Sequence, residues 1–492
     1  MAAYSIPDPI KSVAFLIQSS QIDGRLDPNY NWLKIQVEQE LSRSIYPVSR
    51  IKDVLSKIQY GTSSLANIAG KGFPIIRMNN IQNDDLDLTD IKYIELSKKE
   101  ADNITLNKGD ILFNRTNSKE LVGKCVVFNE DDKWVYASYI IRVVLDQTRI
   151  LPKYASYFLN ARLGRLQVDC ISRQIAGMTN INAEEIKSLK LILPPISKQK
   201  EFVSIIDSAK NRKYALKEEA AEILDSIDSY ILHELGITLP EKDASIEARM
   251  FQTTFTQLSG RRFDPKLFDT HAQNLFVAVE NAPFPKEKLK NLIIHSAAGD
   301  WGLDEELEVK EQEYETCLVI RATEFDNLYN LKLENDRVKY RKIKKNRIKQ
   351  LDILPYDLLI EKSGGSPNQP VGRISLLTED LFENNTLLCY SNFIHKIRVD
   401  TTKVNPSYLF CFLKTIHNIK ITEIMQSQTN GIRNLIMGEY FNQSIILPRL
   451  DKQKEIGKEA NRRRVEAQRL TLEADMVLED ARLEIEEMIL KK

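Results

Sequence analysis

The amino-acid sequence predicts a mixed α/β (α+β) protein in which two similar globular domains are joined by two long antiparallel helices, with approximate two-fold symmetry. Three observations predict this fold class. A junction motif occurs twice, matching positions in the two halves share one offset, and a long charged segment with an apolar stripe follows each junction. The predicted symmetry therefore comes from a duplication.

The junction motif reads LPPISKQKEF at 193–202 and LPRLDKQKEI at 447–456. In each copy an apolar, strand-like run ends at proline, which cannot donate a hydrogen bond to a β-ladder. Ser197 or Asp451 follows as the predicted N-cap, because short polar side chains accept bonds from the first free N–H groups of a helix. Each predicted helix has about 35–40 residues and a length of roughly 55 Å, which is too long for packing on one globular domain alone.

A constant offset relates the two halves. Pro152 and Pro406, like Asn180 and Asn434, lie 254 positions apart (406 − 152 and 434 − 180). Earlier matches keep their order but not their spacing, so the length differences fall in loops, where insertions cost least. A period this long indicates a repeated domain-plus-helix unit and not a solenoid. The predicted boundaries are a first domain at 1–196, a central helix at 197–238, a second domain at 239–450 and a C-terminal helix at 451–492.

Both long segments carry apolar residues at three-, four- and seven-residue steps between charged positions. Such a stripe needs a partner that covers it. Alanine at seam positions of both segments favours pairing of the two helices with each other; the alternative is that each helix packs on its own domain. The predicted seam residues are Phe202, Ile206, Ala209, Leu216, Ala220, Ile223, Ile227 and Ile231 in the first helix, and Ile456, Ala460, Ala467, Leu470, Ala474, Val477, Ala481, Ile485 and Met488 in the second.

The composition is that of an ordinary soluble protein, and we expect a cytoplasmic one. Basic and acidic residues both number 69, so the net charge is zero and any surface that binds nucleic acid has to be local. Five cysteines are scattered without a Cys-x-x-Cys pair, which argues for a reducing compartment and against a structural zinc site. No apolar run approaches membrane-spanning length, so we expect no membrane association.

The sequence shows no constellation of catalytic residues. The segment AGKG at 69–72 lacks the spacing and the Ser/Thr of a phosphate-binding P-loop, and no Gly-x-Gly-x-x-Gly opens a helix. The five histidines are separated along the chain, as structural or surface histidines usually are. We therefore expect no catalytic residue, no metal ligand and no cofactor bound by this chain.

Polar loops that follow apolar strands are the best binding candidates. Each half carries one such loop at 114–119 or 362–369, and a second at 173–182 or 426–434. Asn, Gln and Arg make bidentate contacts to base edges, while Ser, Thr and Lys hold phosphates. Ordinary turns explain the composition equally well, because Asn, Gly and Ser favour turns. The candidate DNA contacts are Arg77, Asn79, Arg115, Asn117, Lys119, Lys124, Arg173, Thr179, Asn180, Arg321, Lys362, Ser363, Ser366, Gln369, Arg373, Gln428, Arg433 and Asn434.

A basic run at 337–349 has two interpretations. Its lysines and arginines suit contact with a phosphate backbone. They suit a solvated surface equally well, because the acidic segment at 304–315 balances their charge.

The order of the motifs resembles the specificity (S) subunits of type I restriction–modification systems. The resemblance covers nearly the whole chain and depends on motif order, duplication and long helices together, since each motif alone is weak. In the loops at 176–179 and 428–433, AGMT and QTNGIR stand where family members often show Gly-Thr-Thr. The motifs are YGT at 60–62, PIIRMNNI at 74–81, GDIL at 109–112, VGK at 122–124, NI at 180–181, LPP at 193–195 and KQKE at 198–201.

The resemblance implies two target recognition domains, each followed by a long helix, that read a bipartite, asymmetric site in double-stranded DNA. It implies a subunit without catalysis of its own. Its partners would be two modification subunits, which bind S-adenosylmethionine and methylate adenine, and restriction subunits with motor and nuclease activity. The helices would set the gap between the two parts of the site, because half-site spacing follows protein geometry.

Two other classes of function stay open at this point. One is a stand-alone, methyltransferase-associated DNA recognition protein, against which the lack of a cofactor loop argues. The other is a coiled-coil scaffold with no role on DNA, which would leave the polar loops as turns.

Overall fold

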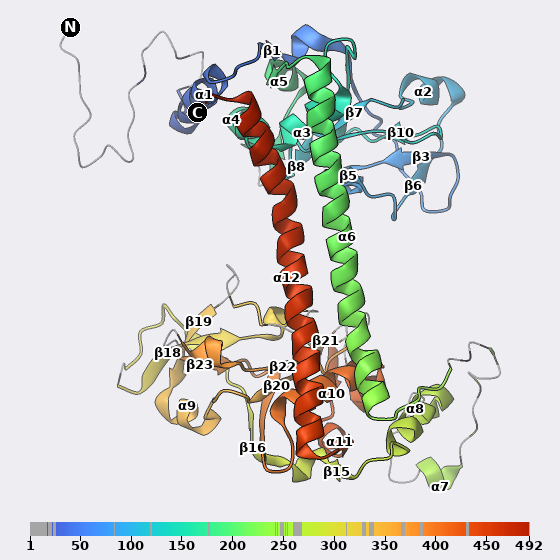
Figure 1. Ribbon diagram of the computed structural model, residues 1–492, viewed down its shortest axis with the longest axis vertical. Coiled ribbons are helices and arrows are strands. Elements are labelled where there is room, and N and C mark those ends of the chain that lie inside the picture. The colour runs from blue at the N-terminus through green and yellow to red at the C-terminus, as the bar shows by residue number, and fades with distance from the viewer. Residues whose placement is uncertain are drawn as a thin grey trace. The chain divides into compact units, whose positions relative to one another are not determined.

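Figure 1 shows the computed structural model, which describes residues 17, 22, 26–82, 84–118, 121–175, 178–241, 243, 245–246, 250, 252, 254–258, 268–310, 312–326, 331–333, 339–365, 370–383, 387–429 and 432–491. The chain divides into two compact units. Unit 1 comprises Met1–Ala215 with Glu473–Lys492, and unit 2 comprises Leu216–Leu472. Both units mix helices and strands, so the predicted fold class is confirmed.

Unit 1 is built around a four-stranded antiparallel sheet. Its elements in chain order are α1 (Pro28–Ser42), β1 (Val48–Arg50), β2 (Leu55–Tyr60), β3 (Phe73–Ile76), β4 (Ile81–Gln82), β5 (Asp85–Leu86), β6 (Lys92–Ile94), α2 (Lys98–Asn103), β7 (Ile111–Asn114), β8 (Thr116–Asn117), β9 (Cys125–Val127), β10 (Val135–Tyr136), β11 (Ile140–Leu145), α3 (Pro152–Asn160), α4 (Arg162–Ile171), β12 (Arg173–Ile175), β13 (Met178–Asn180), α5 (Ala183–Ser188) and β14 (Lys190–Ile192). The central sheet has the order β2-β11-β7-β9, and β10-β3-β6, β12-β13-β8 and the β1–β14 ladder surround it. Strand β7 is buried at every position, which explains its unbroken apolar run before Asn114.

Unit 2 repeats this topology. Its elements are α7 (Phe255–Leu258), α8 (Thr270–Glu280), β15 (Lys286–Lys288), β16 (Ile293–Ala298), β17 (Leu303–Asp304), β18 (Tyr314–Ile320), β19 (Lys339–Lys344), α9 (Lys345–Leu351), β20 (Leu358–Glu361), β21 (Ser363–Gly365), β22 (Ile374–Leu376), β23 (Leu388–Tyr390), β24 (Ile394–Val399), α10 (Pro406–Asn418), β25 (Gln426–Thr429), β26 (Ile432–Leu435), α11 (Met437–Phe441) and β27 (Ser444–Ile446). The sheets are β16-β24-β20-β22, β17-β19-β18-β23, β21-β26-β25 and the β15–β27 ladder. Three of these sheets match sheets of unit 1 strand for strand, and β17-β19-β18-β23 matches β6-β3-β10 with β17 added at its edge.

The two long helices are α6 (Ile196–Glu234), with 39 residues, and α12 (Leu450–Ile489), with 40 residues. Ser197 and Asp451 lie inside the first turn of these helices, so the prediction that they are N-caps is wrong. The described ranges contain no helix that is both long enough and apolar enough to cross a membrane.

A buried glutamine recurs near the start of each long helix. Gln199 and Gln453 are 0% and 1% exposed. Each amide oxygen accepts the backbone N–H of the residue before α3 or α10, at 2.8 Å in both units. Each amide nitrogen donates to the carbonyl of Pro194 or Pro448, again at 2.8 Å. The glutamine therefore joins each long helix to its domain, which explains the repeated KQKE motif.

Within unit 1, the first half of α6 packs against the last part of α12. Ile206 and Ala209 of α6 form one apolar cluster with Leu478 and Ala481 of α12. Phe202, one turn earlier, belongs to the core of the domain. The predicted seam is therefore present, and the helix start packs on its own domain as well.

Within unit 2, the last half of α6 packs against the first part of α12. Ile227 and Ile231 share a buried cluster with Ile456 and Ala460 and with Tyr408 of the domain. The buried members of the predicted seam are Phe202, Ile206, Ala209, Leu216, Ala220, Ile227, Ile231, Ile456, Ala460, Ala467, Leu470, Ala474 and Ala481, whereas Ile223, Val477 and Ile485 are half-buried and Met488 is 38% exposed.

A buried ion pair repeats beside the central strand of each unit. Asp110 Oδ2 lies 2.7 Å from Arg142 Nε, and these side chains are 3% and 7% exposed. Asp357 Oδ2 lies 3.0 Å from Lys396 Nζ, and both side chains are fully buried. Each carboxylate also accepts a backbone N–H from the preceding turn, at 2.7 Å in unit 1 and 2.9 Å in unit 2. The duplicated acid thus fixes the turn that leads into β7 or β20.

The basic run of unit 2 lies against the acidic segment, as far as the structure describes it. Strand β19 pairs with β17, and Arg341 forms an ion pair with Asp304 on that strand. Lys345 Nζ lies 3.3 Å from Glu315 Oε1. The described part of the run is therefore balanced within the domain, as the second interpretation of the sequence proposes; residues 337–338 lie outside the described ranges.

Candidate nucleic-acid interface

Each unit carries a small sheet that brings its two predicted polar loops together. In unit 1, β8 pairs with β13, and Thr116 Oγ1 donates to Asn180 Oδ1 at 2.6 Å. In unit 2, β21 pairs with β26, and Ser363 Oγ donates to Asn434 Oδ1. The segments are short strands and not the loops that were predicted, because backbone ladders join them. The hydroxyl–amide pair recurs at the same place in both units.

A positively charged residue lies at the start of this sheet in each unit: Arg115 in unit 1 and Lys362 in unit 2. Arg115 N donates to Tyr139 O at 2.9 Å, and Lys362 N donates to Phe393 O at 2.8 Å. The carbonyl of each cationic residue accepts a backbone N–H from the end of β13 or β26, at 2.9 Å and 2.8 Å. Both backbones are thus held on two sides, while the side chains are half-exposed. This arrangement presents a positive charge from a fixed backbone, as recognition of DNA requires.

An aromatic ring supports the cation of unit 1. The guanidinium carbon of Arg115 lies 5.0 Å from the ring centroid of Tyr60, within the range of a cation–π contact. The Tyr60 hydroxyl accepts a hydrogen bond from Ala183 N at 3.0 Å. The ring is therefore anchored at one end and 40% exposed, so it orients the arginine.

A histidine lies near the cation of unit 2. Tyr60 of β2 pairs with Ile141 of β11, and Ala298 of β16 pairs with His395 of β24. Ile141 and His395 lie 254 positions apart (395 − 141), so unit 2 has alanine where unit 1 has the tyrosine ring. His395 Nε2 lies 2.7 Å from Ser296 Oγ. Burial, helped by the positive charge of Lys362, lowers the pKa of His395 to about 4. The imidazole is therefore neutral at pH 7 and offers one donor and one acceptor.

Two of the predicted arginines make ion pairs inside their own domain. Arg77 Nη2 lies 2.8 Å from Asp90 Oδ2, and Arg321 Nη2 lies 2.7 Å from Glu324 Oε1. Their backbone N–H groups also bond to side chains of the following turn. The two residues occupy the same place in the two units and shape that turn. Their predicted contact with DNA stays a prediction.

Two more predicted arginines are nearly buried. Arg373 makes two bonds to the Glu361 carboxylate, at 2.8 and 2.9 Å, and its side chain is 11% exposed. It also donates to two backbone carbonyls, at 2.9 and 2.8 Å. Arg433 is likewise 11% exposed, and its Nη1 lies 4.0 Å from Glu423 Oε2. Arg373 and Arg433 are therefore left out of the interface that we propose.

The other candidates differ in accessibility. Asn79 is exposed, Lys124 is half-buried and Thr179 is 5% exposed. Asn117, Arg173 and Gln428 lie on β8, β12 and β25, and the structure describes only the backbone of these three residues. Lys119, Ser366 and Gln369 lie outside the described residues.

Sequence reasoning missed the exposed aromatic residues of this region. Tyr139 and Phe393 are 54% and 49% exposed, and their carbonyls hold the two cationic residues. They lie 254 positions apart (393 − 139), so the constant offset could have identified them. Aromatic faces at such positions suit stacking or van der Waals contact with bases.

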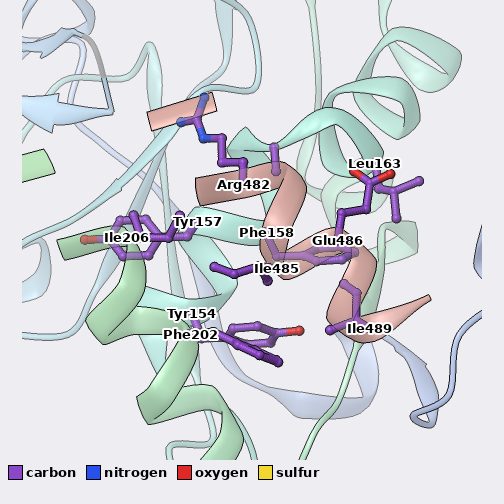
Figure 2. Close-up of a pocket in the computed structure, with 11 residues that line it drawn as sticks. Tyr154, Tyr157, Phe158, Leu163, Phe202, Ile206, Arg482, Ile485, Glu486 and Ile489 are labelled. Atoms are coloured by element: carbon purple, nitrogen blue, oxygen red, sulfur yellow. The ribbon is translucent and has the colours of Figure 1, made fainter. Parts of the chain in front are cut away.

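The cavity drawn in Figure 2 is a packing gap in unit 1. Its volume is ≈ 30 Å³, and its lining is mainly apolar. A space of this size holds about one water molecule, so it admits no cofactor. Within the described ranges, no group of three His, Cys, Asp or Glu side chains is placed to hold a metal ion. The lining includes Tyr154, Phe158, Phe202, Ile206, Ile485 and Ile489.

A larger, polar recess of ≈ 520 Å³ lies where the β4–β5 hairpin meets α6 in unit 1. Lys210 Nζ lies 2.8 Å from Asp85 Oδ1, and Asp207 lies 3.0 Å from Lys153 Nζ. Asp84 of the hairpin forms an ion pair with Arg482 of α12. These pairs hold the domain on the helices, which gives the recess a structural role.

Known proteins resemble this chain in part of its length. Residues 45–226 match the family described as "Type I restriction modification DNA specificity domain". The specificity subunit of the type I restriction enzyme EcoKI from Escherichia coli K12 is 27% identical over 206 residues, which cover 41% of this chain and 43% of that protein. The putative MjaX specificity subunit from Methanocaldococcus jannaschii is 27% identical over 168 residues, or 34% and 40% of the two chains. The chain thus spans less than half the length of these relatives.

Two solved structures are similar over most of the chain. The S subunit of a type I restriction–modification system from M. genitalium has a TM-score of 0.40 at 14% identity, covering 89% of this chain and 96% of that one. A chain from a structure titled for the complex assembly and conformational transition of the type I R-M system has a TM-score of 0.49 at 12% identity, covering 90% and 96%.

Proposed function

We propose that this chain, whose residues 45–226 match the family described as "Type I restriction modification DNA specificity domain", is the DNA-reading specificity subunit of a type I restriction–modification complex. It recognises a bipartite, asymmetric site in double-stranded DNA, one part through each unit. It directs methylation and cleavage by partner subunits in the cytoplasm and has no catalysis of its own.

One observation carries this proposal: a duplicated framework presents two different polar faces. Arg115 beside Tyr60 marks the face of unit 1, and Lys362 near a neutral His395 marks that of unit 2. An arginine prefers the O6 and N7 acceptors of guanine, whereas a lysine contacts bases or phosphates as a point charge. Two different faces predict two different half-sites, so the site is asymmetric.

The proposed partners are two modification subunits, which bind S-adenosylmethionine, and restriction subunits with motor and nuclease activity. An apolar stripe on α12 supports a protein partner, because its residues recur at steps that place them on one helix face. The matching face of α6 is polar. The apolar stripe is therefore a property of α12 alone and is not explained by the duplication of the two helices. The stripe consists of Val465, Leu472, Met476 and Leu483, which are 54–61% exposed, and α6 has Asn211, Glu218, Glu222 and Ser229 at the matching positions.

Methylation mapping tests the proposed function. The full chain is co-expressed with modification subunits, and the methylated sequences are read from host DNA for wild type, Arg115→Ala and Lys362→Ala. Each variant should relax one half-site only, because loss of a base contact costs about 1–3 kcal/mol at that position. Lys187→Ala and Lys403→Ala, at surface lysines paired three residues away, are the controls in units 1 and 2. Unchanged specificity in both test variants would contradict the interface.

A second measurement separates the alternatives. Leu472→Asp with Met476→Asp should abolish co-purification with the modification subunits, whereas Glu218→Lys with Glu222→Lys on α6 should not. Binding of S-adenosylmethionine to the isolated chain would instead support the stand-alone methyltransferase. Intact assembly without any sequence-dependent methylation would support the scaffold.

A further inference from the structure

Two apolar side chains project from a loop of unit 1 beside the proposed interface. Leu65 is 95% exposed and Ile68 is 85% exposed, and they belong to the loop between β2 and β3. Aliphatic side chains with so much surface in water favour a partner that covers them. The interface described above does not use them.

Backbone hydrogen bonds hold the loop at two points, Thr62 and Asn67. Thr62 N donates to Tyr136 O at 3.0 Å, and Thr62 O accepts Ser138 N at 2.7 Å. Asn67 exchanges two backbone bonds with Tyr93, at 2.7 and 2.9 Å. Leu65 is thus the tip of one short arch.

The second arch closes immediately after Asn67. The Asn67 side chain donates to Lys71 O at 3.1 Å and accepts Ala69 N at 3.0 Å, with Ile68 between them. Gly72 ends the arch with φ +95°, and a Cβ at this position would lie 2.1 Å from Ile94 O. Glycine is therefore required for the close approach that holds the arch.

Backbone bonds connect this loop to the cation of unit 1. Thr62 bonds to Ser138, the next residue is Tyr139, and the Tyr139 carbonyl accepts Arg115 N. Residues 61–72 contain no acidic side chain and one cation, Lys71, which is compatible with a phosphate backbone nearby. The corresponding segment of unit 2, 299–313, contains Asp and Glu at seven positions. The apolar tips thus belong to a surface that is suited to DNA in unit 1.

We propose that Leu65 and Ile68 contact thymine methyl groups in the major groove of the half-site that unit 1 reads. The inference rests on the proposed function and adds a determinant of specificity to it. The base edges in the major groove distinguish all four base pairs. The methyl group of thymine is the apolar group that is exposed there. Leu65 and Ile68 belong to a loop whose backbone is bonded to the segment that holds Arg115, and an apolar tip in the groove that Arg115 reads gains from burying a methyl group.

The experiment uses the full chain assembled with modification subunits and the DNA site found by methylation mapping. Duplexes are made with thymine or with uracil, which lacks the methyl group, in the half-site that Arg115→Ala relaxes. Affinities are measured for wild type, for Leu65→Ser with Ile68→Ser, and for Leu307→Ser as control. Leu307 lies in the corresponding segment of unit 2 and is 50% exposed. Thermal unfolding of each variant shows that it folds.

Uracil should weaken wild-type binding about fivefold, as the loss of one buried methyl contact implies. It should leave the double variant unaffected, and the Leu307→Ser control should respond like wild type. Equal losses for wild type and double variant, or no loss in wild type, would overturn the proposal. So would a half-site without thymine, or loss of co-purification with the modification subunits in the double variant, which would assign the tips to a protein contact. A failure to find any methylated site would instead refute the proposed function itself.

Discussion

Units 1 and 2 share the positions that build the framework. The strand order β2-β11-β7-β9 of unit 1 recurs as β16-β24-β20-β22 in unit 2, and Gln199 makes the bonds that Gln453 makes 254 positions later. The acid of the buried ion pair, Asp110 or Asp357, is also the same in both. All of these groups are buried and satisfy backbone donors or acceptors. A substitution there leaves an unsatisfied polar group in the interior, which costs more than most surface changes.

The residues around the small sheet differ between the two units, in the interior as well as on the surface. Beside the Thr116–Asn180 pair, unit 1 buries Asn114, whose amide atoms make no hydrogen bond among the described residues. In the same place unit 2 has Glu361, held by Arg373. The framework and the reading surface are therefore separable, because the residues that form one do not form the other. The variants below test which residues belong to the framework and which belong to the reading surface.

The largest expected effect is on the buried ion pair. Arg142→Met leaves the Asp110 carboxylate buried without its cation, which should cost about 3–5 kcal/mol of unfolding free energy. Lys396→Met should cost less, because Arg398 Nε still lies 2.7 Å from Asp357 Oδ1. Urea unfolding of the full chain, with hydrogen exchange to locate the loss, measures both. Equal losses in the two variants would show that Arg398 does not compensate.

The next effect is a difference in acid sensitivity. All five histidines lie in 216–472, so unit 1 has none. Burial, with the charges of Lys414 and Arg373, lowers the pKa of His417 to about 3. The folded state therefore binds fewer protons than the unfolded state below pH 6.5, and stability is lost as the pH falls toward the folded value. Between pH 7 and pH 5 the shift at His417 should cost unit 2 about 2 kcal/mol, and the lowered pKa of His395 should add a similar loss.

His417→Gln is the variant that checks this assignment. Its free energy of unfolding at pH 7 is lower than that of wild type if the hydrogen bond to Thr422 is lost, but the slope below pH 6.5 should flatten. Leu307→Ser, at an exposed side chain that does not titrate, is the control and should keep the wild-type slope. The assignment to His417 would not survive an unchanged slope in His417→Gln.

A smaller effect is expected where the helices join the domains. Gln199→Ala removes an acceptor and a donor in unit 1, and Gln453→Ala does so in unit 2. Each should cost about 1.5 kcal/mol, since buried backbone groups lose their partners. The adjacent Lys198→Ala and Lys452→Ala remove surface charges and should cost about 0.5 kcal/mol or less. Chemical denaturation ranks the four variants, and equal losses at glutamine and lysine would refute the role of the amide.

The sequence predicted the parts of the fold that depend on periodicity and repetition. The long helices, their apolar seam and the presence of two polar segments in each domain follow from spacing alone, whereas the pairing of those segments as strands did not follow from it. The roles of single side chains did not follow, because Ser197 and Gln199 both suit a helix start and only packing decides between them. Arg373 and Arg115 likewise each flank a strand, yet the guanidinium of Arg373 is bound by Glu361 and the side chain of Arg115 is half-exposed. The difference depends on whether an acidic side chain lies close to the arginine in the folded structure, as Glu361 does to Arg373. The order of residues along the chain does not reveal this.

The smallest expected effect concerns the ring that only unit 1 has beside its cation. Tyr60→Ala should weaken binding to the half-site of unit 1 by about 0.5–1 kcal/mol, because Arg115 loses its cation–π contact. Tyr60→Phe keeps the ring and should keep most of that affinity, although its lost hydroxyl no longer accepts Ala183 N. Tyr340→Ala, at a 47% exposed tyrosine of unit 2, is the matched control. Affinities are measured for duplexes that are altered in one half-site at a time. They show which half-site accounts for the lost affinity of each variant. A loss in Tyr60→Ala that both half-sites share would mean that the ring supports general DNA binding, and the two surfaces would then differ less than their residues suggest.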